Sequence, residues 1–203
     1  KGLFMPKPIP ALTPEFLKKA KDMPYPELAA SVLEPYAKGV FSRSVLDEIC
    51  NDAYDFDIPL EKVDQYRYVM RLDQGPTASF KDFAARFMGR AVGRLVKEAG
   101  RELLILTATS GDTGSAVASA FLGVDNIRVL VLFPTSEVSD RQRKQMTTLG
   151  GNIRVIEIDG KFDDCQRLVK TAFMDQSLAK CNLSSANSIN IGRLIPQSVY
   201  YFY

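Results

Sequence analysis

The chain has 203 residues, of which 46% are hydrophobic and 25% charged, the composition of an ordinary globular protein. Its net charge of +2 is dispersed and no apolar run approaches the roughly twenty residues that span a bilayer, so we expect neither a nucleic-acid partner nor a membrane segment. Histidine is absent, which excludes Ser-His-Asp triads, Cys-His dyads and histidine-based zinc sites and leaves any chemistry to a lysine, a carboxylate, a hydroxyl group or a cofactor.

Residues 1–66 are predicted to form an N-terminal helical segment. Thr13 followed by Pro14 is typical of a helix N-cap with proline in the first helical position, and Pro26 opens a second helix. The stretch from Ser44 to Tyr54 carries apolar residues on one face and predicts a third helix. The segment has no catalytic signature, so we assign it a packing and covering role.

Residues 67–203 alternate between strand and helix patterns. The run Tyr68–Leu72 predicts a strand that Gly75-Pro76 ends, and a helix with a broad apolar face follows from Ser79 to about Glu98. Further strands are predicted at residues 103–106, 129–133 and 153–158, and further helices at residues 113–122, 140–148 and 162–173. This order indicates an α/β fold, with an open and mainly parallel sheet covered by helices.

Lys81 stands at an unusual place for a lysine. Ser79 and Asp82 have the spacing of a helix N-cap and its acidic partner, which puts Lys81 in the first helical turn. The helix dipole disfavours a cation there, but a positive potential lowers the pKa of an amine and so suits a lysine that reacts in its uncharged form. A surface lysine tolerated in a first turn is the alternative.

The loop from Thr107 to Gly114 joins a buried strand to the next helix, the position where open α/β sheets bind ligands. Its glycines allow close backbone approach, and the helix start offers free N–H groups to a carboxylate or a phosphate. The loop matches neither the dinucleotide-binding glycine motif nor a Walker A motif. A small-residue turn in which Asp112 caps the helix is the alternative.

A third polar group lies near the end of the chain, where a strand turns into a last helix. Asn187 or Ser188 could cap that helix or could bind a ligand. Arg193 could supply a bidentate contact to a phosphate or a carboxylate.

The three cysteines are odd in number and have no metal-type spacing, so we expect reduced thiols and no metal site. The stretch from Lys1 to Pro6 does not resemble a signal peptide. Together these features predict a cytoplasmic protein.

Four motifs, taken in order, resemble those of threonine synthases from the branch found in enteric bacteria and fungi. They are Gly75-Pro76-Thr77 with Phe80-Lys81-Asp82, Thr107 to Gly114, Leu149-Gly150-Gly151-Asn152, and Asn187-Ser188-Ile189-Asn190 with Arg193. The likeness runs from about Tyr68 to Tyr203 and extends more loosely over the N-terminal helices.

The resemblance implies a fold-type-II pyridoxal phosphate enzyme, a carbon–oxygen lyase that converts O-phosphohomoserine and water to threonine and phosphate. Lys81 would form the internal aldimine and act as the mobile base. The loop would hold the substrate carboxylate through Thr109, Ser110, Gly111, Thr113 and Gly114. Asp112 stands where many relatives have an asparagine near the pyridoxal 3-oxygen, and its role is left open. The residues implied near the substrate phosphate, or framing the cleft, are Asn187, Ser188, Asn190 and Arg193.

Members of this family are about twice as long as this chain, and no glycine-rich loop for the cofactor phosphate is found in it. We therefore expect the smaller domain of such an enzyme with its N-terminal helices, binding pyridoxal phosphate weakly or not at all. Alternatives are another enzyme of the same fold, such as a threonine dehydratase or a cysteine synthase, a non-catalytic anion-binding module, and a free-standing nucleotide-binding domain. The sequence gives no indication of the oligomeric state.

Overall fold

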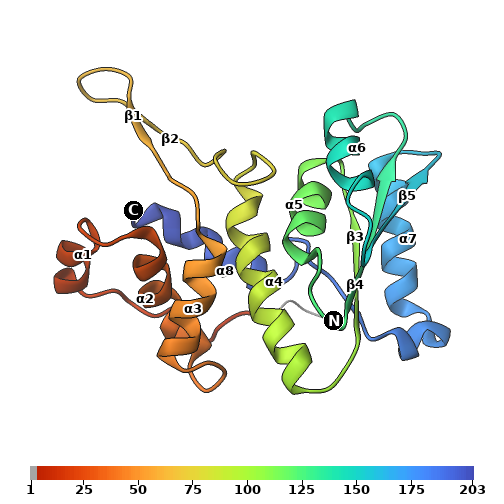
Figure 1. The fold of residues 1–203 in the computed structure, drawn as a ribbon, viewed down its shortest axis with the longest axis horizontal. Helices are drawn as coiled ribbons and strands as arrows, with labels where there is room; N and C mark the ends of the chain where they lie inside the picture. Colours follow the sequence, from red (N-terminus) through yellow and green to blue (C-terminus); the bar gives the residue numbers. More distant parts are fainter. Residues whose placement is uncertain (1–3) are drawn as a thin grey trace.

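The computed structural model describes residues 4–203. The prediction that Lys1 to Pro6 is not a signal peptide therefore falls in part outside the described residues. Figure 1 shows a sheet flanked by helices and, beside it, a group of N-terminal helices, with α4 and α8 between the two. None of the helices within residues 4–203 is long and apolar enough to cross a membrane. In the same range, no cluster of three or more acidic or cysteine side chains is placed to hold a metal ion.

The predicted α/β fold is confirmed. The main sheet has four strands in the order β5-β4-β3-β6, and every neighbouring pair is parallel. Its strands are β3 (Leu103–Ala108), β4 (Ile127–Pro134), β5 (Ile153–Ile158) and β6 (Leu183–Ser184). Because the strands are parallel, their carboxyl ends share one edge of the sheet, and the loops that leave β3 and β4 meet there.

Helices cover both faces of this sheet (Figure 1). On one face lie α4 (Lys81–Glu98), α5 (Asp112–Phe121) and α6 (Asp140–Thr147), and on the other lies α7 (Phe162–Met174). Successive strand residues point to opposite faces, so Ile105 shares a core with Phe121 of α5 while Leu106 shares another with Val169 of α7. Burial on both faces is the reason that β3 and β4 are largely apolar, whereas β5, at the edge of the sheet, alternates.

The N-terminal segment forms three helices, as predicted, together with short connecting pieces. They are α1 (Pro14–Ala20), α2 (Tyr25–Ala37) and α3 (Arg43–Ala53). The hydroxyl of Thr13 accepts a hydrogen bond from the Phe16 N–H at 3.1 Å, which confirms the predicted N-cap. These helices share a core with Phe83 of α4 and with Val199 and Tyr200, which follow α8 (Ile191–Ser198). Because this core draws on both sides of the boundary at 66/67, the division into domains stays a prediction.

The described residues also contain two short 3₁₀ segments, Gln176–Cys181 and Val199–Tyr201. Cys50 and Cys165 are buried free thiols, and Cys181 is an exposed one.

The strand predicted at Tyr68–Leu72 is present as β2, but its pairing differs from the prediction, and its partner β1 was not predicted. β1 (Leu60–Lys62) and β2 (Tyr68–Met70) pair with each other as an antiparallel hairpin, outside the main sheet (Figure 1). The carboxylate of Asp64 accepts hydrogen bonds from the N–H groups of Tyr66 and Arg67, at 3.0 and 2.9 Å, and so closes the turn. This local turn chemistry pairs the strand with its sequence neighbour, where a strand of the main sheet had been expected.

The predicted start of α4 is also corrected. The helix begins at Lys81, so Lys81 does lie in the first turn, but Phe80 occupies the N-cap position and its side chain makes no cap bond. The hydroxyl of Ser79, one residue earlier, still accepts a hydrogen bond from the Lys81 N–H at 3.3 Å. The main partner of Asp82 is Thr77 and not Ser79. The Asp82 carboxylate accepts hydrogen bonds from the backbone N–H and the hydroxyl of Thr77, at 2.9 and 2.6 Å.

Candidate functional site

The first turns of α4 and α5 meet beyond the carboxyl end of β3. Lys81 Nζ lies 3.3 Å from Asp112 Oδ2, although the two residues are thirty-one positions apart. The Lys81 side chain is 21% exposed and that of Asp112 is 47% exposed, so the pair stands at a surface that solvent reaches. Nζ also lies 4.4 Å from the centre of the Phe80 ring, a favourable distance for a cation over an aromatic face. The lysine and the glycine-containing loop that were predicted to cooperate are therefore in contact.

A buried carboxylate braces the turn that leads into Lys81. Asp82 is fully buried and accepts both hydrogen bonds that Thr77 donates. A methyl group on Gly75 would come within 2.6 Å of Asp82 Oδ2, so the turn closes only with glycine there. Ala78 adopts a φ of 54°, a left-handed conformation that is costly for a residue other than glycine. Burial raises the pKa of Asp82, and the hydrogen bonds from Thr77 oppose that rise.

The loop before α5 is shaped from within by Thr109. This side chain is 1% exposed, and its hydroxyl accepts hydrogen bonds from the N–H groups of Gly111 and Gly114 at 2.9 and 2.8 Å. Gly111 has a φ of 136°, which L-residues rarely adopt. Three of the predicted ligand contacts thus bond to one another in this structure. Thr109 holds the loop in shape and does not present its hydroxyl to solvent.

The other N–H groups of the loop remain open. Ser110 is exposed and Thr113 half-buried, and within the described part of the chain the N–H groups of Ser110, Asp112 and Thr113 donate to no protein atom. These groups cluster at the amino end of α5, where the helix dipole adds positive potential. The arrangement can bind an anionic group such as a carboxylate.

Gln142 is the residue of this site that the sequence interpretation missed. Its Nε2 donates a hydrogen bond of 2.7 Å to Asp112 Oδ1, the carboxylate oxygen that faces away from Lys81. This bond first, and the charge of Lys81 after it, lower the pKa of Asp112 below its ordinary value, against the opposing effect of burial. One feature of the sequence could have pointed to Gln142: its spacing from Ser139 is typical of a capping box, and the two residues form one at the start of α6.

The C-terminal polar group reaches the same edge of the sheet through Asn187. Its Nδ2 donates to the carbonyl oxygen of Ala108, the last residue of β3, at 3.1 Å. Ser188 is exposed, and both residues line a hollow of about 380 Å³ that also contains Lys170 of α7. Of the predicted group, these two side chains lie nearest to open space.

Asn190 and Arg193 are engaged within the protein. Asn190, and neither Asn187 nor Ser188, caps α8, because its Oδ1 accepts from the Gly192 N–H at 2.9 Å. Arg193 is 3% exposed and donates from Nη1 to the carbonyl oxygen of Ala186 at 2.5 Å. Its Nε is buried and has no hydrogen-bond partner among residues 4–203. Burial lowers the pKa of this guanidinium. An exposed bidentate contact from Arg193 is therefore not available in this structure.

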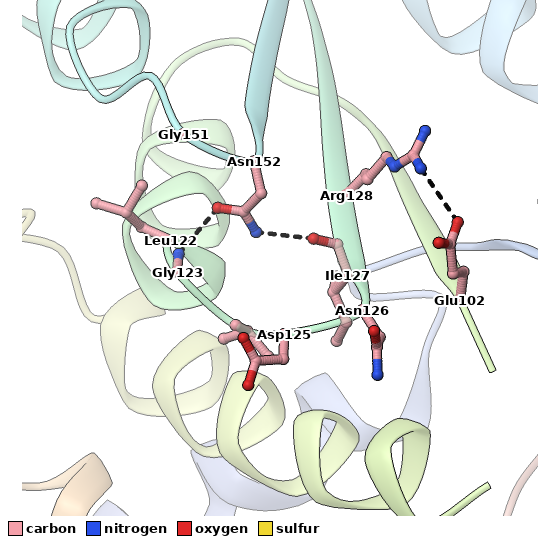
Figure 2. Close-up of a pocket in the computed structure, with 10 residues that line it drawn as sticks. Glu102, Leu122, Gly123, Asp125, Asn126, Ile127, Arg128, Gly151 and Asn152 are labelled. Carbon is pink, nitrogen blue, oxygen red and sulfur yellow. Dashed lines mark hydrogen bonds and ion pairs between the residues drawn. The ribbon is translucent and has the colours of Figure 1, made fainter. Parts of the chain in front are cut away.

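A different hollow, of about 400 Å³, lies at the opposite, amino end of the sheet. Figure 2 shows the Asn152 side chain at its centre, with the amide oxygen directed at Gly123 and the amide nitrogen at Ile127. Arg128 and Glu102 form an exposed ion pair at its rim (Figure 2). None of the predicted site residues lines this hollow.

Two family models match the chain. The model described as pyridoxal-phosphate dependent enzyme matches residues 57–192, and the model described as threonine synthase N terminus matches residues 1–54. The first of these covers the hairpin, the sheet and every predicted site residue except Arg193.

Curated relatives and solved structures agree with these models. Threonine synthase from Haemophilus influenzae is 45% identical over 99% of this chain and 47% of the relative, and that from Escherichia coli is 40% identical over the same shares. The crystal structure of pyridoxal phosphate-bound threonine synthase from Brucella melitensis superposes with a TM-score of 0.91 at 38% identity, over 99% of this chain and 45% of that one. The chain thus spans about half the length of the relatives that it matches.

The residues of the site fit the aldehyde end of pyridoxal phosphate. Lys81 offers a partly exposed primary amine with a carboxylate 3.3 Å away, and the open N–H groups beside it can receive an anionic substrate group. The predicted cofactor is that of the matching family model and of the Brucella melitensis structure. The chain therefore belongs to the pyridoxal-phosphate dependent enzyme family, and it matches the N-terminal portion of that family's threonine synthases.

Proposed function

We propose that this chain forms the lysine-bearing and carboxylate-binding side of a threonine synthase site, which converts O-phosphohomoserine and water to threonine and phosphate as a carbon–oxygen lyase. The observation that carries the proposal is the 3.3 Å approach of Lys81 Nζ to Asp112, at the start of a helix with open N–H groups. The 45% identity to a threonine synthase over nearly the whole chain supports the choice of reaction.

Pyridoxal phosphate, when bound, supplies the electron sink that makes the substrate carbon–hydrogen bonds acidic. Lys81 is then the residue that moves protons. As a free amine it would take the proton from Cα and then one from Cβ, after which phosphate would leave from Cγ. Lys81 would return the two protons to Cγ and to Cα, while water adds its hydroxyl group at Cβ and its proton goes to the departing phosphate. One lysine that serves several transfers explains how a chain without histidine can support this chemistry.

The loop before α5 orients the substrate. Its open N–H groups, those of Ser110, Asp112 and Thr113, bind the α-carboxylate, and the hydroxyls of Ser110 and Thr113 add further donors. Thr109, Gly111 and Gly114 act indirectly, because the Thr109 hydroxyl holds the two glycine N–H groups in the shape that this binding needs.

For Asn187 and Ser188 we propose a contact with the substrate phosphate, because both lie at the carboxyl edge of the sheet and both have donors to offer it. Asn190 and Arg193 frame the cleft from behind, through the α8 cap and through the Ala186 carbonyl group. For the 203-residue chain by itself we propose weak cofactor binding or none, since no loop for the cofactor phosphate is found in it. A spectral titration with pyridoxal phosphate tests this, and tight binding by the chain alone would contradict it.

The decisive experiment uses the full-length protein that contains this chain. We expect it to release phosphate and threonine from O-phosphohomoserine, and borohydride to trap pyridoxal phosphate on Lys81. Lys81→Ala should lower turnover by at least about a hundredfold, the usual contribution of a catalytic base, with the fold retained. Lys81→Arg is the matched variant, because it keeps the positive charge beside Asp112 and loses the reactive amine.

Other outcomes identify the alternatives. Release of 2-oxobutyrate from threonine would point to a dehydratase, and replacement of a β-substituent by sulfide to a cysteine synthase. An unlabelled Lys81 in the borohydride experiment would overturn the catalytic proposal and leave a non-catalytic anion-binding module.

A further inference from the structure

Gln142 joins two structures that the chain builds separately. Its Oε1 accepts hydrogen bonds from the N–H and the hydroxyl of Ser139, at 3.1 and 2.9 Å, and this half of the amide belongs to the capping box of α6. Its Nε2 leaves α6 and donates to Asp112 Oδ1, in the first turn of α5, at 2.7 Å. Both ends of the side-chain amide are therefore bonded, and its orientation is set.

The neighbouring backbone makes room for this amide. A methyl group on Gly111 would lie 2.4 Å from Cδ and Nε2 of Gln142, closer than non-bonded atoms approach. The absence of a side chain at Gly111 thus serves two purposes, the unusual φ of the loop and the passage of Gln142 to Asp112.

The consequence falls on Asp112. Its two carboxylate oxygens have different partners: Oδ1 accepts from Gln142, and Oδ2 faces Lys81 Nζ at 3.3 Å. A carboxylate without the first bond would be free to turn about its terminal torsion, which has broad minima. With that bond, one oxygen is held toward the lysine.

We infer that Gln142 is a positioning residue, which orients the Asp112 carboxylate toward Lys81. The effect of Gln142 on the chemistry of Lys81 rests on the proposed function, whereas its effect on the orientation of Asp112 does not. The lowered pKa of Asp112, for which the Gln142 bond is the main cause, is consistent with it. The competing explanation is that Gln142 only caps α6.

Two variants separate the cap from the contact. Gln142→Glu keeps the shape of the side chain and an oxygen for the capping box, in which glutamate is a preferred residue, but it replaces the donor to Asp112 by a second carboxylate. Ser139→Ala removes the cap of α6 and leaves the bond from Nε2 to Asp112 in place.

The measurement is the pKa of the Asp112 carboxyl group, followed by carbon-13 NMR in the aspartate-labelled full-length protein, with Asp112→Asn to assign the signal. We expect Gln142→Glu to raise this pKa clearly, because a donor is lost and a like charge is added, and Ser139→Ala to leave it near the wild-type value while lowering Tm. An unchanged pKa in Gln142→Glu would overturn the inference. So would an equal rise in both variants, because Gln142 would then act only through the cap.

A second readout concerns Lys81. The rate of borohydride trapping of pyridoxal phosphate at neutral pH should fall roughly three- to tenfold in Gln142→Glu, because the added negative charge favours the unreactive ammonium form, and it should hold in Ser139→Ala. A trapping rate that is equal in Gln142→Glu and wild type would count against the inference. If wild type itself shows no trapping, the proposed function fails, whereas the Asp112 titration still decides the role of Gln142.

Discussion

The two ends of the sheet each carry a side-chain amide that makes several hydrogen bonds, and the two amides have different partners. At the amino end, Asn152 donates to the carbonyl oxygens of Phe121 and Ile127, at 2.9 and 2.8 Å, and accepts from the N–H of Gly123 at 2.8 Å. All three partners are backbone groups. At the carboxyl end, Gln142 reaches the ionised side chain of Asp112.

This difference separates a hollow that stabilises the fold from an edge that can perform chemistry. The amino-end hollow in Figure 2 is well formed, but its central amide is fully used in satisfying backbone groups, and its charged pair, Arg128 with Glu102, is exposed and weak. The carboxyl edge brings an amine, a carboxylate and open N–H groups together. The identity of the bonded groups, and not the depth of a hollow, therefore locates the site.

The largest stability effect is expected at the carboxyl end, from Asp82→Ala. The change leaves the N–H and the hydroxyl of Thr77 buried without an acceptor, which should lower the free energy of unfolding by about 3 kcal/mol. Urea denaturation of the full-length protein measures it. Asp125→Ala is the matched control at the amino end, where the side chain is exposed and a change within about 0.5 kcal/mol is expected. Equal losses in the two variants would contradict the stabilising role that we assign to the buried carboxylate of Asp82.

A smaller effect is expected from Asn152→Ala. Three backbone groups lose their partner, but the rim of the hollow is open enough for water to replace part of the bonding, so the loss should be about 2 kcal/mol. Trapping of pyridoxal phosphate on Lys81 should stay at the wild-type rate. Asn51→Ala, which removes one exposed bond within α3, should cost under about 0.5 kcal/mol. A loss of trapping in Asn152→Ala would break the distinction between the two ends.

The smallest effect concerns acid pH and Asp112. Its folded-state pKa is lowered, so its contribution to stability is present above the unfolded-state pKa and is lost as pH falls through the folded-state value. Because the side chain is 47% exposed and screened by solvent, the contribution should stay under about 0.5 kcal/mol. Asp112→Asn should therefore flatten the acid side of the stability curve slightly. Urea titrations at a series of pH values test this, and a steeper acid loss in the variant would contradict the sign.

Asp82 should behave in the opposite sense. Its pKa is raised by burial, so what it contributes is fully present below the unfolded-state pKa and declines as pH rises through the folded-state value. In the same titrations, wild type should lose free energy of unfolding as pH rises through the folded-state pKa of Asp82, and Asp82→Asn should abolish that loss. Asp112→Asn should instead abolish a loss that occurs as pH falls through the folded-state pKa of Asp112.

Much of the α/β region could be predicted from local patterns. The strand at Ile153–Ile158 has the predicted bounds, and the neighbouring elements differ by a few residues at their ends. Periodicity succeeds for β3 and β4 because burial on both faces demands largely apolar runs, and for β5 because an edge strand with one more exposed face alternates. It misses β1, a short exposed strand, and it locates β2 without its pairing, because the Asp64 turn decides that pairing.

The site was predicted less completely than the fold. Lys81 and the loop before α5 lie together as expected, because both follow from the geometry of parallel strands and helix starts. Gln142 was missed, since its contact with Asp112 depends on how α6 packs against α5. The Asn190 cap and the burial of Arg193 were likewise not visible in the spacing of polar residues.

The sequence by itself determined the order of helices and strands in the α/β region after the hairpin, the place of Lys81 in a first helical turn, and the type of chemistry left to a chain without histidine. These properties depend on residues within a few positions of one another or on composition. Only the tertiary structure decided which polar groups are spent on the fold and which remain open to a ligand. Which polar groups stay open depends on burial and on partners that lie thirty or more positions away in the sequence. A hydrogen-bonding group in a folded protein pairs with whichever partner the packing brings within reach.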